Sequence, residues 1–260
     1  MKIKKLREKN PLILHYTNEV TINDCANITL GIGASPIMSY SLEEVEEIVP
    51  LANAVVINIG TMASEKLNLF LKAGKIANKL NKPIILDPVG CFATKTRLEF
   101  TKKLLKEVKF SVIKGNLAEI KSIGGLISEG KGVDSNDENM DENFLMNLSK
   151  NLNSVLVATG KEDVITNGSK VIKIPNGDKM LKGVTGTGCM TASLIGSFLG
   201  SGESNLDSAL YGTLAMSICG ELAAKNSNGF GSFKINILDN ISNLNDKILS
   251  DVRKDYVYEI

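Results

Sequence analysis

The chain has 260 residues, and its 30 lysines and arginines nearly balance 29 aspartates and glutamates, leaving a formal net charge of +1. Such a charge provides no overall field for holding a nucleic acid or an anionic membrane, and the absence of Trp disfavours stacking on single-stranded bases. No run approaches the roughly 18 to 20 apolar residues of a membrane span. We therefore expect a cytoplasmic protein with a small-molecule site, without nucleic-acid or membrane partners, built as one domain over residues 1–260.

Cysteine and histidine usage narrows the possible chemistry further. The four cysteines are widely spaced, without a CxxC pair or a histidine at zinc-like spacing, so we expect reduced thiols of which at most one is chemically active. His15 is the only histidine. This argues against a histidine-based triad or metal cluster and favours a structural role for His15 itself.

Short β-branched runs alternate with longer amphipathic runs through the middle of the chain. The predicted strands lie at 53–60, 82–90, 109–115 and 154–160. The predicted helices lie at 64–80 with Ser64 as a cap, at about 96–107, from Asn116 onward and at 141–152, and an exposed polar loop is expected at 128–143. This alternation is typical of a mostly parallel sheet with right-handed crossovers and helices on both faces.

The pattern changes beyond the fourth predicted strand. Two alternating runs within 163–175 flank Asn167-Gly168, a pair that strongly favours a tight hairpin, so we expect an antiparallel edge on the sheet. Two long apolar helices follow at 184–200 and 205–225, and their many Gly, Ala and Ser residues indicate close packing. The predicted fold class is therefore α/β, with three layers around a mostly parallel sheet.

Polar side chains stand where three of the predicted strands end. Asp87 follows one buried strand, Lys114 closes the next with Glu119 one helical turn further on, and Thr159 closes the last. Ligands of open parallel sheets bind at the carboxyl ends of the strands, so we expect these four side chains to converge on one site. The two carboxylates there are suited to hold Mg²⁺ through waters beside a phosphate.

Each of these residues also has a plain structural interpretation. Asp87 precedes a proline and is a common turn residue, although its place at a buried strand end favours a functional role. Asn116 and Glu119 match a helix capping box, which is the preferred interpretation without the neighbouring motifs. Lys114 is equally compatible with a solvated strand end, and Met38 is by default a core methionine.

The segment GVTGTGC, residues 183–189, leads into the first apolar helix. Its glycines let backbone N–H groups face inward, and the helix offers free N–H groups and the positive end of its dipole to a phosphate. The segment is not a P-loop, and it is not the dinucleotide fingerprint because position 191 is Thr. Taken alone, these glycines are also compatible with simple turn formation.

Cys189 stands at the first turn of this helix. A thiol in such a place is expected to have a lowered pKa, which suits a nucleophile or a weak base. A Cys-His hydrolase is disfavoured because His15 is the only histidine, and a phosphate bound to the same loop would push the pKa back up. We therefore expect the thiol to be a neighbour of the group that is phosphorylated.

Most of these residues lie in longer motifs distributed over nearly the whole chain. The motifs are TNEVTINDCANITLGIGASPIM (17–38), NIGT (58–61), ILDPVG (85–90), IKGNLAEI (113–120), ATG (158–160) and VTGTGC (184–189). In these motifs and in their order the sequence resembles the hydroxyethylthiazole kinases, the thiamine-salvage members of the ribokinase-like fold.

The resemblance implies a nucleotide site and a metal site at the predicted strand ends. ATP would be held by Lys114 and Thr159, with Mg²⁺ near Asp87 and Glu119. Position 114 is more often Arg in the family, and Lys gives up a bidentate grip on phosphate. This departure affects the details of the nucleotide contact rather than the role of the residue.

The resemblance also implies an acceptor site and an assembly. The thiazole would contact Met38 and Gly186, with Asn18 close by, and Cys189 would be the catalytic residue, where most ribokinase-like kinases carry Asp as a base. The phosphate cradle would comprise Thr185, Gly186, Thr187 and Gly188. The resemblance implies a homotrimer in which each thiazole pocket lies between two subunits. Met38 and Cys189 of one site would then come from different chains.

The function that the resemblance implies is ATP- and Mg²⁺-dependent phosphorylation of 4-methyl-5-(2-hydroxyethyl)thiazole for thiamine salvage. The alternatives are a hydroxymethylpyrimidine kinase, a nucleotide-dependent NAD(P)H-hydrate dehydratase, or a non-catalytic nucleotide-binding sensor. The two enzymes are expected to carry Asp in the glycine loop instead of Cys189. A sensor would have no need for Asp87, Glu119 and an acceptor pocket.

Overall fold

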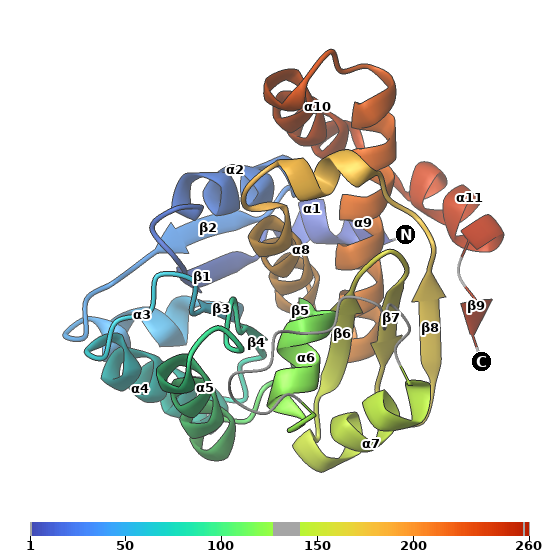
Figure 1. The fold of residues 1–260 in the computed structure, drawn as a ribbon. Helices are drawn as coiled ribbons and strands as arrows, with labels where there is room; N and C mark the ends of the chain where they lie inside the picture. Colours follow the sequence, from blue (N-terminus) through green and yellow to red (C-terminus); the bar gives the residue numbers. More distant parts are fainter. Residues whose placement is uncertain (1, 127–140, 257, 260) are drawn as a thin grey trace.

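A nine-stranded sheet runs through the part of the chain that the structure, a computed structural model, describes: residues 2–126, 141–256 and 258–259 (Figure 1). The order of its strands is β2-β1-β3-β4-β5-β6-β7-β8-β9. They are β1 (Leu12–Tyr16), β2 (Ser35–Met38), β3 (Ala54–Asn58), β4 (Ile84–Asp87), β5 (Val112–Asn116), β6 (Val155–Thr159), β7 (Asp163–Thr166), β8 (Val171–Ile174) and β9 (Tyr258–Glu259). The strands from β2 to β6 in this order are parallel, and β7 to β9 continue the sheet in antiparallel pairs.

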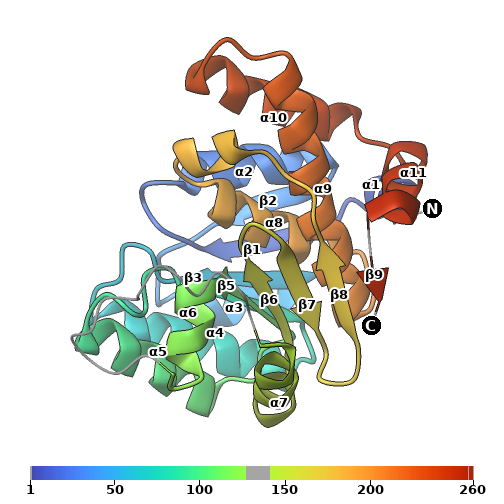
Figure 2. The same cartoon turned by 45° about the vertical axis from the view of Figure 1, so that its right-hand side comes forward.

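Helices cover both faces of this sheet (Figures 1 and 2). The first face is covered by α1 (Lys2–Lys9), α2 (Ile22–Ile32), α8 (Thr187–Gly200), α9 (Asn205–Lys225), α10 (Phe230–Asn243) and α11 (Asp246–Tyr256). The second is covered by α3 (Val45–Leu51), α4 (Lys66–Lys79), α5 (Lys95–Glu107), α6 (Leu117–Ile123) and α7 (Glu142–Leu152). Strand residues alternate between the two cores, so that Val56 and Ile85 face the first and Val55 and Leu86 the second. The predicted three-layer arrangement is confirmed.

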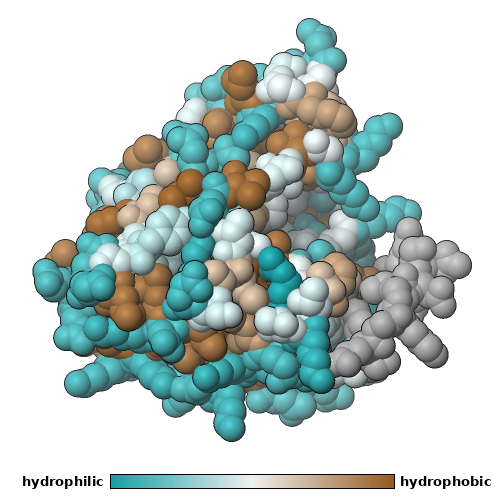
Figure 3. Space-filling view, turned by 60° about the vertical axis from the view of Figure 1, so that its left-hand side comes forward, coloured by the Kyte–Doolittle hydropathy of each residue, from teal (hydrophilic) through white to brown (hydrophobic). Residues whose placement is uncertain are grey.

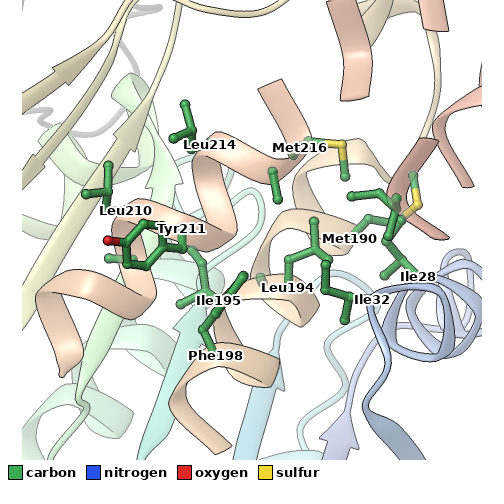
Figure 4. Packing of buried hydrophobic residues seen from close by; sticks show 14 of the residues in the cluster. Ile28, Ile32, Met190, Leu194, Ile195, Phe198, Leu210, Tyr211, Leu214 and Met216 are labelled. Carbon is green, nitrogen blue, oxygen red and sulfur yellow. The ribbon is translucent and has the colours of Figure 1, made fainter. Parts of the chain in front are cut away.

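Helix α8 is buried along most of its length, between the sheet and the helices α2 and α9. Figure 4 shows Phe198 of α8 beside Tyr211 of α9, and their ring centres are 5.9 Å apart. A Cβ atom at Gly212 would lie 2.6 Å from the backbone nitrogen of Ile195, so only glycine permits this close crossing of α8 and α9. Because α8 is fixed on three sides, its first turn is fixed as well.

The elements predicted from residue 53 onward are confirmed within a few residues, including the antiparallel hairpin of β7 and β8. Ser64 as a cap is wrong: α4 begins at Lys66, its N-cap is Glu65, and no side chain accepts a capping hydrogen bond. The loop expected at 128–143 lies outside the described residues, except for its last three, which are the N-cap Asp141 and the first two residues of α7. Before residue 53, where the sequence pattern predicts no elements, the structure has α1, β1, α2, β2 and α3. Across the described ranges, no helix is both long and apolar enough to cross a membrane.

Candidate active site

A pocket of about 690 Å³ opens at the carboxyl ends of the central strands. Most of the residues that the sequence assigns to a site line it together: Asp87, Lys114, Glu119, Thr159, Gly186, Thr187, Gly188 and Cys189. The strand ladders explain this convergence, because Asn116 pairs with Thr159 across β5 and β6, and Asn58 pairs with Asp87 across β3 and β4. The predicted convergence of the strand ends is therefore confirmed, while Met38, Asn18 and Thr185 stand outside the pocket lining.

Asp87 and Lys114 form a buried pair at the floor of the pocket. The Nζ atom of Lys114 lies 3.8 Å from Oδ1 of Asp87, and their side chains are 5% and 1% exposed. Burial, partly offset by Lys114, raises the pKa of Asp87 to about 7. Burial works to lower the pKa of Lys114, but Asp87 and Glu119 outweigh it and raise that pKa above its ordinary value. Lys114 is therefore a buried cation and not the solvated strand end that the sequence also allowed.

Glu119 connects two of the strand-end turns. Its Oε2 accepts a hydrogen bond from the backbone N–H of Asn116 at 2.7 Å, and Oδ1 of Asn116 accepts from the N–H of Glu119 at 2.9 Å, completing a capping box at the start of α6. Its Oε1 accepts from the N–H of Gly90 at 2.8 Å, in the turn after β4. The capping box is thus real, and the same carboxylate faces the pocket beside Asp87.

The donor atoms at this floor suit a hard cation. Oδ1 of Asp87 is buried and accepts no hydrogen bond from any described residue. Each oxygen of Glu119 accepts one N–H and retains a lone pair. No group of three His, Cys, Asp or Glu side chains in the described ranges forms a metal cage. These oxygens could hold a cation such as Mg²⁺, which is usually bound by one or two carboxylates together with waters and substrate phosphates.

The glycine loop turns sharply into α8. Gly186 is the N-cap of α8 with φ of 95°, and a Cβ atom there would lie 2.8 Å from Cγ2 of Thr21. A Cβ atom at Gly188 would lie 2.9 Å from Nζ of Lys114, so the loop backbone and the lysine approach each other closely. The hydroxyl of Thr187 donates to the carbonyl of Leu181 at 3.0 Å and holds the loop against the preceding 3-10 helix, η1 (Lys179–Gly183). The first N–H groups of α8 therefore face the pocket next to a buried cation, as an anion site requires.

The Cys189 thiol lies beneath this loop, 8% exposed. Its Sγ lies 3.3 Å from Nδ2 of Asn18 and 3.2 Å from Nδ2 of Asn58. Burial, followed by the charge of Asp87, raises the pKa of Cys189 to about 11. The expectation of a lowered pKa is wrong, because desolvation and a neighbouring carboxylate outweigh the helix dipole.

The other end of the pocket has a more varied lining. Thr159 and Asp163 contribute from the turn between β6 and β7, and Met216 contributes from α9. The carboxylate of Asp163 accepts from the N–H of Gly160 at 3.0 Å and from the hydroxyl of Ser217 at 3.3 Å, and burial raises its pKa to about 6. This end is therefore lined by both polar and apolar side chains.

Sequence reasoning missed two residues behind the pocket. Asn58 contacts both Asp87 and Cys189, and the signal that would have found it is a polar residue closing the apolar run at 53–58. Arg97 of α5 donates to the carbonyls of Ile59, Val89 and Gly60 at 3.2, 3.0 and 2.9 Å. It thereby ties the turn after β3 to the turn after β4. No sequence signal marks it, because its partners are backbone atoms.

His15 lies away from the pocket lining, in the first core. Its Nδ1 lies 3.0 Å from the carbonyl of Ile13 and its Nε2 lies 3.2 Å from Oγ of Ser193. Burial lowers the pKa of His15 to about 4, so the ring is neutral near pH 7. The structural role expected for it is confirmed.

Comparison with known proteins identifies the family of the chain. Residues 3–247 match the model of the hydroxyethylthiazole kinase family. The chain is 58% identical over 249 residues to a hydroxyethylthiazole kinase of Clostridioides difficile, covering 95% of each. Its structure superposes on the solved hydroxyethylthiazole kinase of Pyrococcus horikoshii with a TM-score of 0.88 and 36% sequence identity. The match covers 100% of this chain and 97% of that one. A ribokinase-like superfamily protein from Enterococcus faecalis, 13% identical, shares the fold with a TM-score of 0.65 over 97% of this chain and 95% of that one. The chain thus has the ribokinase-like fold and belongs to the hydroxyethylthiazole kinase family.

Proposed function

We propose that this protein transfers the γ-phosphoryl group of ATP to the hydroxyl of 4-methyl-5-(2-hydroxyethyl)thiazole, in the salvage of thiamine. The observation that carries the proposal is the convergence of the α8 glycine loop, the buried Lys114 and Asp87 on one pocket, in a chain of this family. We also propose that residues 1–260 form one kinase domain, since strands from Leu12 to Glu259 belong to one sheet. We also propose a cytoplasmic location, because the proposed co-substrate is ATP and because the four cysteines form no disulfide, as is typical of a reducing compartment.

The proposed ATP site spans the two ends of the pocket. Lys114 and the N–H groups at Thr187 and Gly188 bind the transferred phosphate, while Thr159 contacts the nucleotide further out. Asp87, through its Oδ1, which accepts no hydrogen bond from a described residue, and Glu119 would hold Mg²⁺, which when bound supplies charge neutralisation of the phosphates. Lys114 remains a point charge and positions the phosphate without the fork of an arginine.

In the proposed transfer, the alcohol oxygen of the thiazole forms a bond to the γ-phosphorus. The bond between that phosphorus and the β–γ bridging oxygen breaks, ADP leaves with the electron pair, and the hydroxyl proton passes to the product phosphate. Cys189 is protonated at the start because its pKa is raised, so it lies beside the alcohol as a neutral thiol. A loose transition state asks little of a base, which is why a thiol suffices where an acid is usual.

Replacement of Cys189 tests this role. Cys189→Asp places a carboxylate where it can accept the hydroxyl proton, so kcat is expected to stay at the wild-type level or rise by up to about tenfold. Cys189→Ser, which keeps a small neutral group, is expected to retain most activity. Steady-state kinetics with both variants measures this. An inactive Cys189→Ser together with an unaffected Glu119→Ala would contradict the assignment.

A homotrimer with the thiazole pocket between subunits is also proposed, with Met38, Gly186 and Asn18 as thiazole contacts. Met38 closes β2, the strand at one edge of the sheet, and every residue of β2 is only half-buried. Exposed apolar side chains cluster in the neighbouring sequence: Val20, Leu30, Tyr40, Leu42 and Leu51. Figure 3, turned toward this side, shows apolar residues interspersed with polar ones. An edge strand and apolar surface of this kind are what a partner chain would cover.

Light scattering coupled to size exclusion tests the trimer. The wild-type protein is expected to show three times the mass of one chain. Met38→Glu is expected to dissociate it and to raise KM for the thiazole alcohol about tenfold or more, because a charge would be buried in the interface. The matched control is Leu80→Glu, which alters a leucine 41% exposed at the end of α4 and is expected to leave the trimer intact. A wild-type monomer with full activity would refute the shared pocket.

The test of the proposed function is acceptor-dependent turnover. Purified protein is incubated with Mg·ATP with and without the thiazole alcohol, and ADP is quantified. ADP is expected in quantity only when the alcohol is present, because the alcohol supplies the hydroxyl oxygen that receives the phosphoryl group. Equal ADP formation with and without the alcohol would contradict the proposal, and so would the absence of ADP in both reactions.

A further inference from the structure

Asn58 lies behind the pocket and has no place among the residues that line it. It closes β3 after four buried apolar residues and is itself 2% exposed. A buried amide carries a desolvation cost unless its hydrogen bonds are satisfied, a cost that another apolar residue would avoid. The hydrogen bonds of this amide must therefore offset that cost.

Hydrogen bonds fix the orientation of the Asn58 amide. The backbone N–H of Gly60 lies 2.9 Å from Oδ1, and a backbone N–H can only donate. On the other side, Nδ2 donates to Oδ2 of Asp87 at 2.7 Å, and Asp87 is the direct neighbour of Asn58 in the β3–β4 ladder. Both contacts demand the same orientation of the side chain.

Asn18 extends the network in a consistent direction. The N–H of Thr21 donates to Oδ1 of Asn18 at 3.1 Å, and Nδ2 of Asn18 donates to Oδ1 of Asn58 at 3.0 Å. Each amide also directs Nδ2 at the Cys189 sulfur, at 3.3 Å from Asn18 and 3.2 Å from Asn58. Both hydrogens and both lone pairs of the Asn58 amide are thus engaged, and the sulfur accepts from two amides.

We infer that Asn58 is a positioning residue that holds the Cys189 sulfur and the Asp87 carboxylate in a fixed relation for phosphoryl transfer. The inference rests on the proposed function of the pocket. By binding Oδ2 of Asp87, Asn58 leaves Oδ1 on the side of Lys114. By donating to Sγ together with Asn18, it sets the direction of the thiol hydrogen, away from both amides.

Two variants at this position separate donor loss from shape change. Asn58→Asp keeps an acceptor for Gly60 and replaces the donor with an oxygen that faces Asp87, while Asn58→Leu removes donor and acceptor together. A displacement of the reacting groups by about 1 Å costs about a hundredfold in rate, so both variants are expected to lower kcat about a hundredfold. KM for ATP and for the thiazole alcohol is expected to change by less than about threefold, because the amide does not line the pocket.

The matched control is Asn53→Leu, just before the same strand. Oδ1 of Asn53 accepts from the N–H of Leu12 at 2.8 Å, at the end of β3 remote from the pocket. This variant is expected to melt at a lower temperature with kcat unchanged. Combination of each change with Cys189→Ala completes a double-mutant cycle. Cys189→Ala, unlike Cys189→Ser, removes the atom that accepts from both amides and is expected to lower kcat about tenfold. Its effect and that of Asn58→Leu are expected to overlap by at least about fivefold, whereas Asn53→Leu multiplies independently.

The outcomes are distinguishable. A folded Asn58→Asp or Asn58→Leu with kcat within about threefold of wild type would overturn the inference, and so would full multiplicativity with Cys189→Ala. An equal kcat loss in Asn53→Leu would reduce Asn58 to a general support of β3. Absence of thiazole-dependent turnover in the wild-type protein would overturn the proposed function itself and this inference with it.

Discussion

Replacement of Asp87 with asparagine is expected to lower kcat by about a thousandfold without lowering the melting temperature. The amide retains the shape and the contact with Asn58 but removes Oδ1, a buried carboxylate oxygen that accepts no hydrogen bond in the described structure. Burial raises the pKa of Asp87 to about 7 from an ordinary 3.8, so at pH 8 the folded protein holds a carboxylate that would be more favourable in the unfolded chain. A neutral side chain relieves that cost. Kinetics and thermal melts at pH 8 measure both effects.

The matched control is Glu203→Gln, three residues beyond the last residue of α8. Burial works to raise the pKa of Glu203, but its bonds to Lys2 and Lys5 outweigh burial and lower it, so this carboxylate stabilises the fold near neutral pH. Its replacement is expected to lower the melting temperature and leave kcat unchanged. The two replacements should therefore have opposite effects: Asp87→Asn lowers kcat and not the melting temperature, and Glu203→Gln lowers the melting temperature and not kcat. Equal kcat values for Asp87→Asn and wild type would remove Asp87 from the chemistry.

Gly186→Ala is expected to disable the phosphate cradle, with kcat/KM reduced about a hundredfold. A Cβ atom at this position would lie 2.8 Å from Cγ2 of Thr21, and φ of 95° is strained for any side chain. Relief of either problem rotates the first turn of α8, which carries the N–H groups facing the pocket. Left-handed strain alone costs roughly 1–2 kcal/mol. Steady-state kinetics and chemical denaturation report the two effects separately.

Gly202→Ala provides the control for Gly186→Ala. Gly202 follows the other end of α8 with φ of 85°, and the nearest atom to an added Cβ would be Nζ of Lys9 at 3.5 Å. This variant is expected to lose similar stability and keep its activity. Addition of Thr21→Ser to Gly186→Ala removes the clashing methyl group, so partial recovery of kcat/KM is expected. Equal activity of the two glycine variants would show that the cradle geometry does not matter for catalysis.

The sheet could be predicted from β3 to β8 because its signals there are local, whereas β9 was not predicted. Strands β3 to β6 are apolar runs that alternate with amphipathic helices, and the hairpin of β7 and β8 carries its own turn pair. The earlier strands lack such signals. Strand β2 contains Pro36 and lies at an edge, and β1 joins the sheet only through neighbours distant in the sequence, among them Ala54.

The site could be predicted to the level of which residues converge, since parallel strands present their ends at one edge. The electrostatics could not. The pKa of Cys189 depends on burial beneath the loop and on the neighbouring Asp87, and neither is visible in the sequence near residue 189. Glu119 binds the N–H groups of Asn116 and Gly90, and only the first contact could be predicted. Asn116 is three residues away in the sequence, whereas Gly90 belongs to the turn after another strand.

The most direct measurement is a competition among acceptor alcohols. The protein is incubated with Mg·ATP and an equimolar mixture of 4-methyl-5-(2-hydroxyethyl)thiazole, a hydroxymethylpyrimidine and a sugar alcohol, and the products are identified by mass. The thiazole phosphate is expected to form first and to dominate, and Asp87→Asn is expected to abolish it. Phosphorylation of the pyrimidine or the sugar in preference to the thiazole would contradict it.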